Sequence, residues 1–191
     1  MTSLRGMSSV NPQNTPKTMA NKIRTGFYGG SFNPIHEGHL ALGDYLIAHK
    51  LVDECWFVVS PQNPMKKTAD PTDAKKRLQA VTKALQNHPG CSASDIEFNL
   101  PLPSYTVQTL RFAVDKHPDR EFVLLIGGDN LEVFSKWKEY EYLLNNFDIL
   151  VYPRPGHSNQ IPDGWNRMKM LDGEMMEISS TEIRKRRRME P

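Results

Sequence analysis

Hydrophobic residues in this chain gather into short apolar runs that are separated by longer segments with helical spacing. Residues 55–59 (Cys-Trp-Phe-Val-Val) and 122–126 (Phe-Val-Leu-Leu-Ile) are continuously apolar, as in strands buried on both faces of a parallel sheet. Weaker β-prone runs occupy residues 23–28, 95–98 and 147–152. We therefore expect five strands in this part of the chain.

Apolar positions three or four residues apart predict the helices between these strands. The expected helices begin near residue 38, after an N-cap at Thr72 or Asp73, after an N-cap at Ser104, near residue 130 and near residue 140. Because strands and helices alternate, we predict one Rossmann-like, doubly wound α/β domain. Its sheet should have five or six mostly parallel strands joined by right-handed crossovers.

The two ends of the chain differ from this alternating middle. Residues 1–20 are rich in Ser, Asn, Pro and Thr and lack the apolar stretch of a secretory signal, which predicts a disordered extension. Residues 167–178 are predicted to form a hairpin around Asp172-Gly173, a pair typical of two-residue turns. Ser179 can begin a last helix. The predicted domain therefore spans residues 21–188.

The composition limits the classes of function. With 191 residues, 38% of them hydrophobic, the chain can bury one core. The formal charge is only +2, and we interpret the basic run 184–188 as the solvated end of a helix, although such runs also bind nucleic acid. No run of 18 apolar residues occurs, so we expect no membrane span. The two cysteines, Cys55 and Cys91, are too few for a disulfide framework or a zinc site and fit a reducing, cytoplasmic compartment.

The segment after the first predicted strand carries the strongest chemical signal. Gly29 and Gly30 allow the backbone to approach a ligand closely, and an Asn-Pro turn leads to His36 and His39 at the start of a helix. The free N–H groups and dipole of a helix start favour an anion, and two imidazoles add donors, so we predict a phosphate site. The alternatives are a solvated histidine pair or two metal ligands, for which no third ligand is evident nearby.

Loops of unusual composition also follow the other predicted strands. They contain Lys66 and Lys67 after the second strand, Gly127 and Asp129 after the fourth, and Arg154 after the fifth. The carboxyl ends of parallel strands share one edge of a sheet, where open sheets bind ligands. We therefore expect these loops to converge on one crevice.

Two further helix starts are suited to anions. Ser180 and Thr181, with Arg184 one turn further on, can contact phosphate oxygens, and an ordinary capped helix with a solvated Arg184 is the alternative. The helix start at Tyr105 and Thr106 offers N–H groups to a carboxylate, or is a plain helix cap.

Asp129 and Trp137 are candidates for contacts with a nucleotide. A carboxylate at a strand end can accept hydrogen bonds from ribose hydroxyls, and an indole can stack on an aromatic ring. Alternatively, Trp137 forms a helical core face with Tyr140 and Leu144.

Two motifs connect these residues with a known superfamily. Residues 29–39, GG-x-F-N-P-x-H-x-GH, resemble the signature of the HxGH nucleotidyltransferases. Residues 178–184, ISSTxIR, resemble the second phosphate-binding motif of adenylyltransferases in that superfamily. Because the two motifs lie far apart in the sequence, their joint occurrence by chance is improbable.

Three more segments are similar to those of bacterial nicotinate mononucleotide adenylyltransferases. They are PSYTxxTL at 103–110, the Gly-Gly-Asp at 127–129 followed by Trp137, and RPG at 154–156. The resemblance covers about residues 22–184.

The resemblance implies transfer of AMP from ATP to nicotinate mononucleotide, giving deamido-NAD and pyrophosphate in NAD synthesis. The acceptor's own phosphate would then attack the α-phosphorus in line, and Mg²⁺ would arrive with ATP. Catalytic roles are implied for His36, His39 and Arg184. Contacts with ATP are implied for Gly29, Gly30, Ser31, Phe32, Lys66, Lys67, Gly127, Ser180 and Thr181. Contacts with nicotinate mononucleotide are implied for Ser104, Tyr105, Thr106, Asp129, Trp137, Lys138 and Arg154.

Two positions depart from the pattern of this family. Many members have His-Lys where this chain has Lys66 and Lys67 after Met65, which leaves open which lysine contacts phosphate. Lys138 follows Trp137 where an aromatic residue is common, and a cation there would favour a nicotinate carboxylate over an amide. The alternatives are adenylylation of nicotinamide mononucleotide or phosphopantetheine, or a non-catalytic nucleotide sensor. The sequence also leaves open whether the protein is a homo-oligomer.

Overall fold

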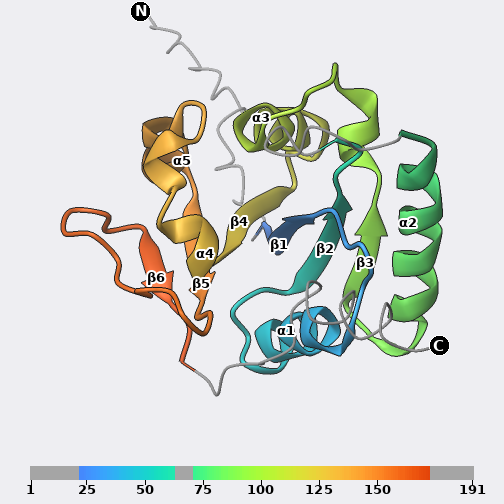
Figure 1. Cartoon of the computed structure of the whole chain (residues 1–191), viewed down its shortest axis with the longest axis horizontal. Coiled ribbons are helices and arrows are strands. Elements are labelled where there is room, and N and C mark those ends of the chain that lie inside the picture. The colour runs from blue at the N-terminus through green and yellow to red at the C-terminus, as the bar shows by residue number, and fades with distance from the viewer. Residues whose placement is uncertain (1–21, 63–70, 173–191) are drawn as a thin grey trace, which may run out of the picture.

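A computed structural model describes residues 22–62 and 71–172 of the chain, which form a parallel sheet with helices on both faces (Figure 1). The strands are β1 (Ile23–Gly30), β2 (Glu54–Val59), β3 (Cys91–Ser94), β4 (Arg120–Gly127), β5 (Asp148–Tyr152) and β6 (Met168–Met170). The helices are α1 (Glu37–Ala48), α2 (Pro71–Ala84), α3 (Thr106–Lys116), α4 (Gly128–Leu131) and α5 (Tyr140–Asn146), with short 3₁₀ helices at Leu85–Asn87, Ile96–Asn99 and Phe134–Lys136. The doubly wound α/β fold predicted from the sequence is confirmed, and all the strand pairs of the sheet are parallel.

The order of the strands creates a natural ligand-binding position. The sheet has six strands in the order β3-β2-β1-β4-β5-β6, so the chain winds outward in one direction from β1 and in the other from β4. The segment after β1 leads to α1 on one face, whereas the segment after β4 leads to α4 on the other. Open parallel sheets bind ligands outside the carboxyl ends of strands at such a reversal.

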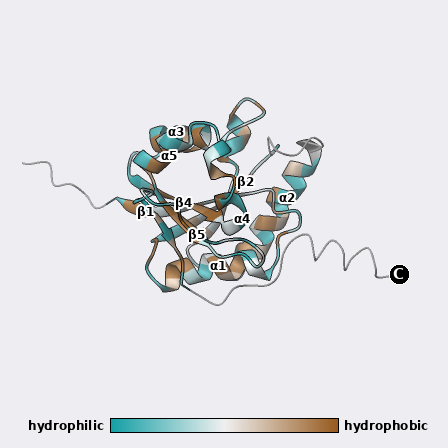
Figure 2. Ribbon diagram, turned by 60° about the vertical axis from the view of Figure 1, so that its left-hand side comes forward, coloured by the Kyte–Doolittle hydropathy of each residue, from teal (hydrophilic) through white to brown (hydrophobic). Residues whose placement is uncertain are grey.

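Each face of the sheet has its own hydrophobic core. The core on one face contains Val107 and Leu110 of α3, Leu131 of α4 and Leu143 of α5. The core on the other face contains Leu40 and Leu46 of α1 and Val81 of α2. Figure 2 shows hydrophobic residues concentrated on the strands between these helices.

The two cores explain why the strands are apolar throughout. Side chains alternate between the faces of a strand, so Leu124 of β4 packs into the α3 core and Leu125 into the α1 core. Because both faces of the strand are covered, a polar side chain at either position would be buried away from solvent. The predicted strands 55–59 and 122–126 are therefore confirmed.

The prediction of a strand at residues 95–98 was wrong. The third strand lies earlier, at Cys91–Ser94, where it pairs with β2, and Ile96–Asn99 then turn as a 3₁₀ helix. This turn lets Ile96 pack into the α3 core and Phe98 against the α1 core. In a strand these two side chains would lie on the same face, so burying them on opposite faces requires a turn. This burial outweighs the weak β preference of the short segment.

The two predicted N-caps are also displaced in the structure. Helix α2 begins at Pro71, a favoured first residue, so that Thr72 and Asp73 lie within the first turn. Helix α3 has Tyr105 as its N-cap. Ser104, which is 2% exposed, turns its hydroxyl into the protein instead of capping the helix.

The segment after β5 is described only in part. The predicted strand around residues 167–171 is present as β6, and it is parallel to β5. Its predicted hairpin partner at 174–178, the last helix after Ser179 and the extension at 1–20 lie outside the described residues. Within the described ranges, none of the helices has the length and hydrophobicity needed to cross a bilayer.

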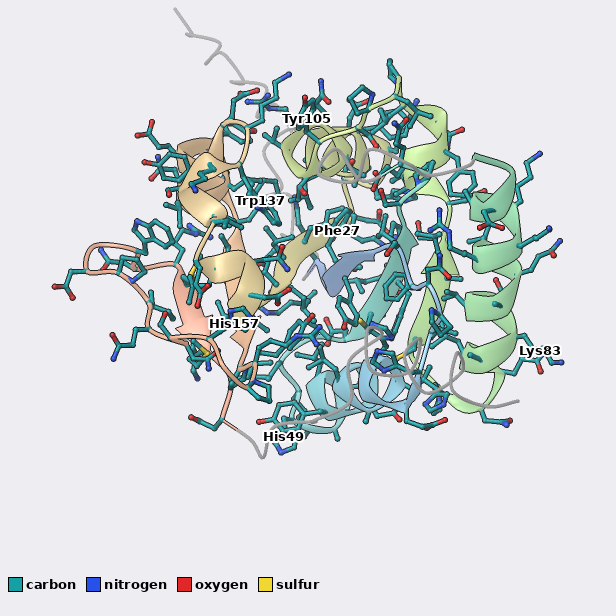
Figure 3. All side chains as sticks on the ribbon, in the orientation of Figure 1. Phe27, His49, Lys83, Tyr105, Trp137 and His157 are labelled. Carbon is teal, nitrogen blue, oxygen red and sulfur yellow. The ribbon has the colours of Figure 1, made fainter. Side chains whose placement is uncertain are left out.

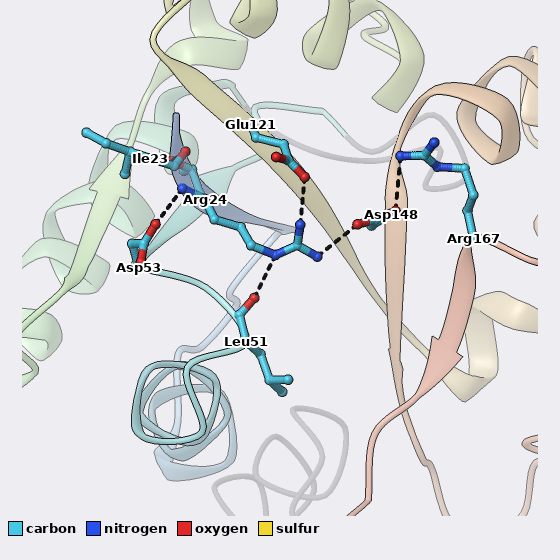
Figure 4. A network of polar contacts seen from close by, with 8 residues as sticks. Ile23, Arg24, Leu51, Asp53, Glu121, Asp148 and Arg167 are labelled. Carbon is cyan, nitrogen blue, oxygen red and sulfur yellow. Dashed lines mark hydrogen bonds and ion pairs between the residues drawn. The ribbon is translucent and has the colours of Figure 1, made fainter. Parts of the chain in front are cut away.

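An ion-pair network ties the strands together at the edge of the sheet opposite the carboxyl ends (Figure 4). Arg24 of β1 contacts Glu121 of β4 at 2.6 Å and Asp148 of β5 at 2.9 Å. Its Nε atom donates to the carbonyl of Leu51, and its backbone N–H donates to Asp53. The network fixes β1 against β4, β5 and the α1–β2 connection.

Candidate active site

The start of α1 holds two histidines in a defined arrangement. His36 is the N-cap, and its carbonyl accepts hydrogen bonds from the N–H groups of His39 and Leu40. The backbone N–H of His36 donates to Nδ1 of His39 over 3.2 Å. Since Nδ1 accepts this bond, a neutral His39 carries its proton on Nε2 and presents a donor there.

The two imidazole rings stack on each other and are held neutral. Their centroids are 3.6 Å apart, and His39 is 8% exposed. Burial, and then the nearby His36 and Arg154, lower the pKa of His39 to about 3. Burial and then Arg154 also lower the pKa of His36, against the opposing effect of Glu37. Both rings are therefore neutral at pH 7.

In the described part of the chain, His36 carries unpaired polar atoms at the start of α1. Among the residues that the structure describes, its two ring nitrogens are buried and lack a hydrogen-bond partner. Buried polar groups are normally paired, because an unpaired one costs about 1–3 kcal/mol. A ligand oxygen at the start of α1 would satisfy one of these nitrogens.

The buried ring of Phe32 packs against His39. Phe32 is a non-glycine residue with φ of 43°, its ring is 3% exposed, and the ring centroid lies 5.1 Å from that of His39. A Cβ atom on Gly30 would lie 3.0 Å from the Phe32 ring, so a side chain at this position would crowd the ring. Gly30 thus makes room for a core side chain that orients His39.

Among the residues that the structure describes, Arg154 in the loop after β5 is a cation near the two histidines. Arg154 donates from Nη2 to the hydroxyl of Tyr152 over 3.0 Å, and its Nε atom lies 3.5 Å from Oδ1 of Asp129. Its charge is close enough to lower the pKa of both His36 and His39. The structure therefore brings the loops after β1, β4 and β5 together, as the sequence predicted.

Asn159 holds Arg154 in place, a role that the sequence analysis missed. Its Oδ1 atom accepts from the N–H of Arg154, and its Nδ2 atom donates to the carbonyls of Arg154 and His157, each over 2.9 Å. A Cβ atom on Gly128 would lie 2.0 Å from Asn159 Oδ1. Residues 157–165 have no hydrophobic periodicity that could have pointed to this role. The one local signal for Asn159 is its residue type, because asparagine tolerates the left-handed φ of 48° that it adopts here.

The loop after β5 is also attached to the end of α4. The N–H of Ser158 donates to Oε1 of Glu132 over 3.0 Å, and Nδ1 of His157 lies 3.1 Å from the same atom. Figure 3 shows His157 in this loop, beside α4. These contacts restrict the position of the Arg154 backbone further.

A second group of predicted residues lies between α3 and α5. Tyr105 and Trp137 both pack against the α3 core, and Figure 3 shows them on the same side of the sheet. The Nζ atom of Lys138 lies 4.7 Å from the centre of the Tyr105 ring. The first N–H groups of α3, from Thr106 onward, have no partner within the helix, as at every helix start. The group combines an aromatic surface, a cation and free N–H donors.

Some predicted site residues lie outside this description. They are Lys66, Lys67, Ser180, Thr181 and Arg184. Within residues 22–62 and 71–172, no three His, Cys, Asp or Glu side chains gather as a metal site would require.

Comparisons with known proteins agree on one family. The cytidylyltransferase-like family model matches residues 27–186. A protein of Cytophaga hutchinsonii named "Probable nicotinate-nucleotide adenylyltransferase" is 46% identical over 85% of this chain and 84% of its own length. A protein of Bacteroides fragilis with the same name is 48% identical over 85% of this chain and 81% of its own.

A solved structure shows the same fold at lower sequence identity. The nicotinic acid mononucleotide adenylyltransferase of Plasmodium falciparum, complexed with NaAD, aligns with a TM-score of 0.70 and 20% identity. The alignment covers 85% of this chain and 83% of the Plasmodium chain. At this identity the likeness supports the fold alone.

The low pKa of His39 predicts a pH-dependent loss of stability. The unfolded chain binds a proton at its ordinary pKa of about 6.5, whereas the folded chain does so only near pH 3. Stability therefore falls as the pH drops through 6.5, by about 2 kcal/mol between pH 7 and pH 5 for this group. His39→Asn keeps an oxygen that can accept from the N–H of His36 but cannot titrate. Urea unfolding at pH 7, 6 and 5 should show that the wild type loses about 2 kcal/mol more than this variant, and equal losses would contradict the neutral state of His39.

Proposed function

The chain belongs to the nicotinate-nucleotide adenylyltransferases of the cytidylyltransferase-like family, and we propose that it transfers AMP from ATP to nicotinate mononucleotide. The products are deamido-NAD and pyrophosphate, in a step of NAD synthesis. The observation that carries the proposal is the neutral His39–His36 pair beside Arg154, at a helix start on the ligand-binding edge of the sheet.

The reaction needs no nucleophile from the protein. A phosphate oxygen of nicotinate mononucleotide attacks the α-phosphorus of ATP, and the bond from that phosphorus to the oxygen bridging to the β-phosphate breaks. Pyrophosphate leaves with the electron pair of that bond. Catalysis therefore consists of aligning the two phosphates and stabilising the charge that develops between them.

His39 and Arg154 are suited to that stabilisation. The Nε2–H group of His39 would donate to a non-bridging oxygen of the α-phosphate, and Arg154 would supply positive charge on the side of the acceptor phosphate. His36 and the free N–H groups at the start of α1 would bind the other phosphate oxygens. The histidines would add donors without adding charge, and Arg154 would supply positive charge beside them.

The residues between α3 and α5 are suited to the pyridine ring of the acceptor. Trp137 would stack on the ring, the N–H groups near Thr106 would bind its carboxylate, and Lys138 would attract the same carboxylate. Asp129 would accept a hydrogen bond from a ribose hydroxyl. Ser104, which the sequence placed among these contacts, is buried, so we propose that it supports Tyr105 rather than touching the substrate.

The remaining expectations rest on the sequence motifs. Ser31, Gly127, one of Lys66 or Lys67, and the motif with Ser180, Thr181 and Arg184 would complete the contacts with ATP. We propose that Mg²⁺ arrives on the phosphates of ATP, as this ion commonly does. The two cysteines are free thiols, which supports a cytoplasmic location.

The proposal predicts a specific product and a specific acceptor. Purified protein with ATP and Mg²⁺ should release pyrophosphate and form deamido-NAD with nicotinate mononucleotide, and it should react more slowly with nicotinamide mononucleotide or phosphopantetheine. His39→Ala should lower the turnover number about 100- to 1,000-fold, because one donor to the developing charge is lost. Chromatography of the products and a coupled pyrophosphate assay measure both effects.

Circular dichroism would show that His39→Ala remains folded. A preference for another acceptor would contradict the proposed substrate, and the absence of pyrophosphate would favour a nucleotide sensor. Undiminished turnover in the variant would contradict the role of His39.

Lys138 should contribute to the choice of acid over amide. Lys138→Ala should lower the preference for nicotinate over nicotinamide mononucleotide about fivefold in kcat/KM, the size expected of an exposed charge pair. Lys136→Ala removes an exposed lysine two residues earlier and is the matched control. The role of Lys138 fails if both variants keep the wild-type preference in parallel assays with the two acceptors.

A further inference from the structure

A buried carboxylate lies between the two halves of the proposed site. Glu97 is 7% exposed and sits on the 3₁₀ helix Ile96–Asn99, whose neighbouring side chains pack into opposite cores. Its Oε1 atom accepts from the hydroxyl of Ser60 over 2.8 Å and from the hydroxyl of Ser104. These two serines come from different loops, one after β2 and one before α3.

Arg77 of α2 completes this arrangement on the ATP side. Its guanidinium donates to the carbonyls of Ser31 and Ser60, over 2.5 and 2.9 Å, and to that of Pro61 over 3.2 Å. Arg77 is 9% exposed, and the charge of Glu97 acts on it through space. The loops after β1 and β2 are thus attached to one buried cation.

Ser104 continues the network to the acceptor side. It directly precedes Tyr105 and Thr106, the residues at which α3 begins. Its buried hydroxyl is bonded to Glu97, and its effect on the site would act through the position of α3. A hydrogen bond to a carboxylate is stronger than one between neutral groups, which makes this attachment firm.

We propose that Glu97 is a positioning residue that sets the start of α3, and with it the acceptor site, relative to the loops that bind ATP. The inference rests on the proposed function, because it takes Tyr105 and Thr106 as part of the nicotinate mononucleotide site. In-line attack requires both phosphates in a narrow range of positions, and a displacement of about 1 Å can cost about 100-fold in rate.

Four variants test this role. Ser104→Ala removes only the bond to the acceptor side and should raise the KM for nicotinate mononucleotide about tenfold, with the KM for ATP within about twofold of wild type. Glu97→Ala should raise the KM for nicotinate mononucleotide at least as much and also lower kcat. Glu97→Gln keeps an oxygen for both hydroxyls and should recover most of the loss. Ser94→Ala is the control and should match the wild type, because the Ser94 hydroxyl accepts from the N–H of Ile96, whereas Glu97 accepts from Ser60 and Ser104.

Initial-rate kinetics with each substrate varied, together with thermal unfolding of each variant, separate the outcomes. Loss of thermal stability in Ser104→Ala and Glu97→Ala with kcat and both KM values unchanged would overturn the proposal, since Glu97 would then be purely structural. A Glu97→Gln variant as impaired as Glu97→Ala would overturn it as well. If Glu97→Ala does not fold, the KM values of Ser104→Ala test the proposal: a raised KM for nicotinate mononucleotide alone supports it, and two unchanged KM values overturn it. A wild type inactive with nicotinate mononucleotide would instead refute the proposed function.

Discussion

The hydrogen bond from the backbone N–H of His36 to Nδ1 of His39 determines what this site can do. It fixes the tautomer of His39, so that the proton is on Nε2, and burial keeps the ring neutral. A protonated His39 would place a second positive charge near Arg154 in a buried position, which is costly. The glycine at residue 30, the buried ring of Phe32 and the stacked ring of His36 all serve to hold this one imidazole.

The reversal of strand order between β1 and β4 brings the other candidate site residues close to the hydrogen-bonded His36 and His39. Successive crossovers carry the loops after β1, β2, β4 and β5 to the same edge of the sheet. At this edge Asn159 fixes Arg154, and Glu97 with Arg77 fixes the loops on the side of β2. At the opposite edge, the ion pairs of Arg24 join β1 to β4 and β5.

More of the fold than of the candidate site could be predicted from the sequence. Strands β2 and β4 could be predicted because burial on both faces demands a continuous apolar run. The pairing of His36 with His39 could be expected because the two residues lie three apart at a helix start. The strand expected at residues 95–98 was wrong because Ile96 and Phe98 pack into opposite cores, whereas residues two apart in a strand share one face. A four-residue run in the sequence does not reveal this difference. Ser104 could not be recognised as a buried donor, nor Asn159 as the support of Arg154. Their partners lie only seven and five residues away in the sequence, but the contacts depend on irregular loop conformations that no periodic pattern predicts.

The protonation state of His39 in solution tests the central claim most directly. Nitrogen-15 NMR of the histidine rings, recorded from pH 7 to pH 5 with and without a non-hydrolysable ATP analogue, reports each ring nitrogen separately. We predict a proton on Nε2 and none on Nδ1 down to pH 5, and a change in the Nε2 resonance when the analogue binds. A doubly protonated ring at pH 6 without ligand, or a proton on Nδ1, would contradict this.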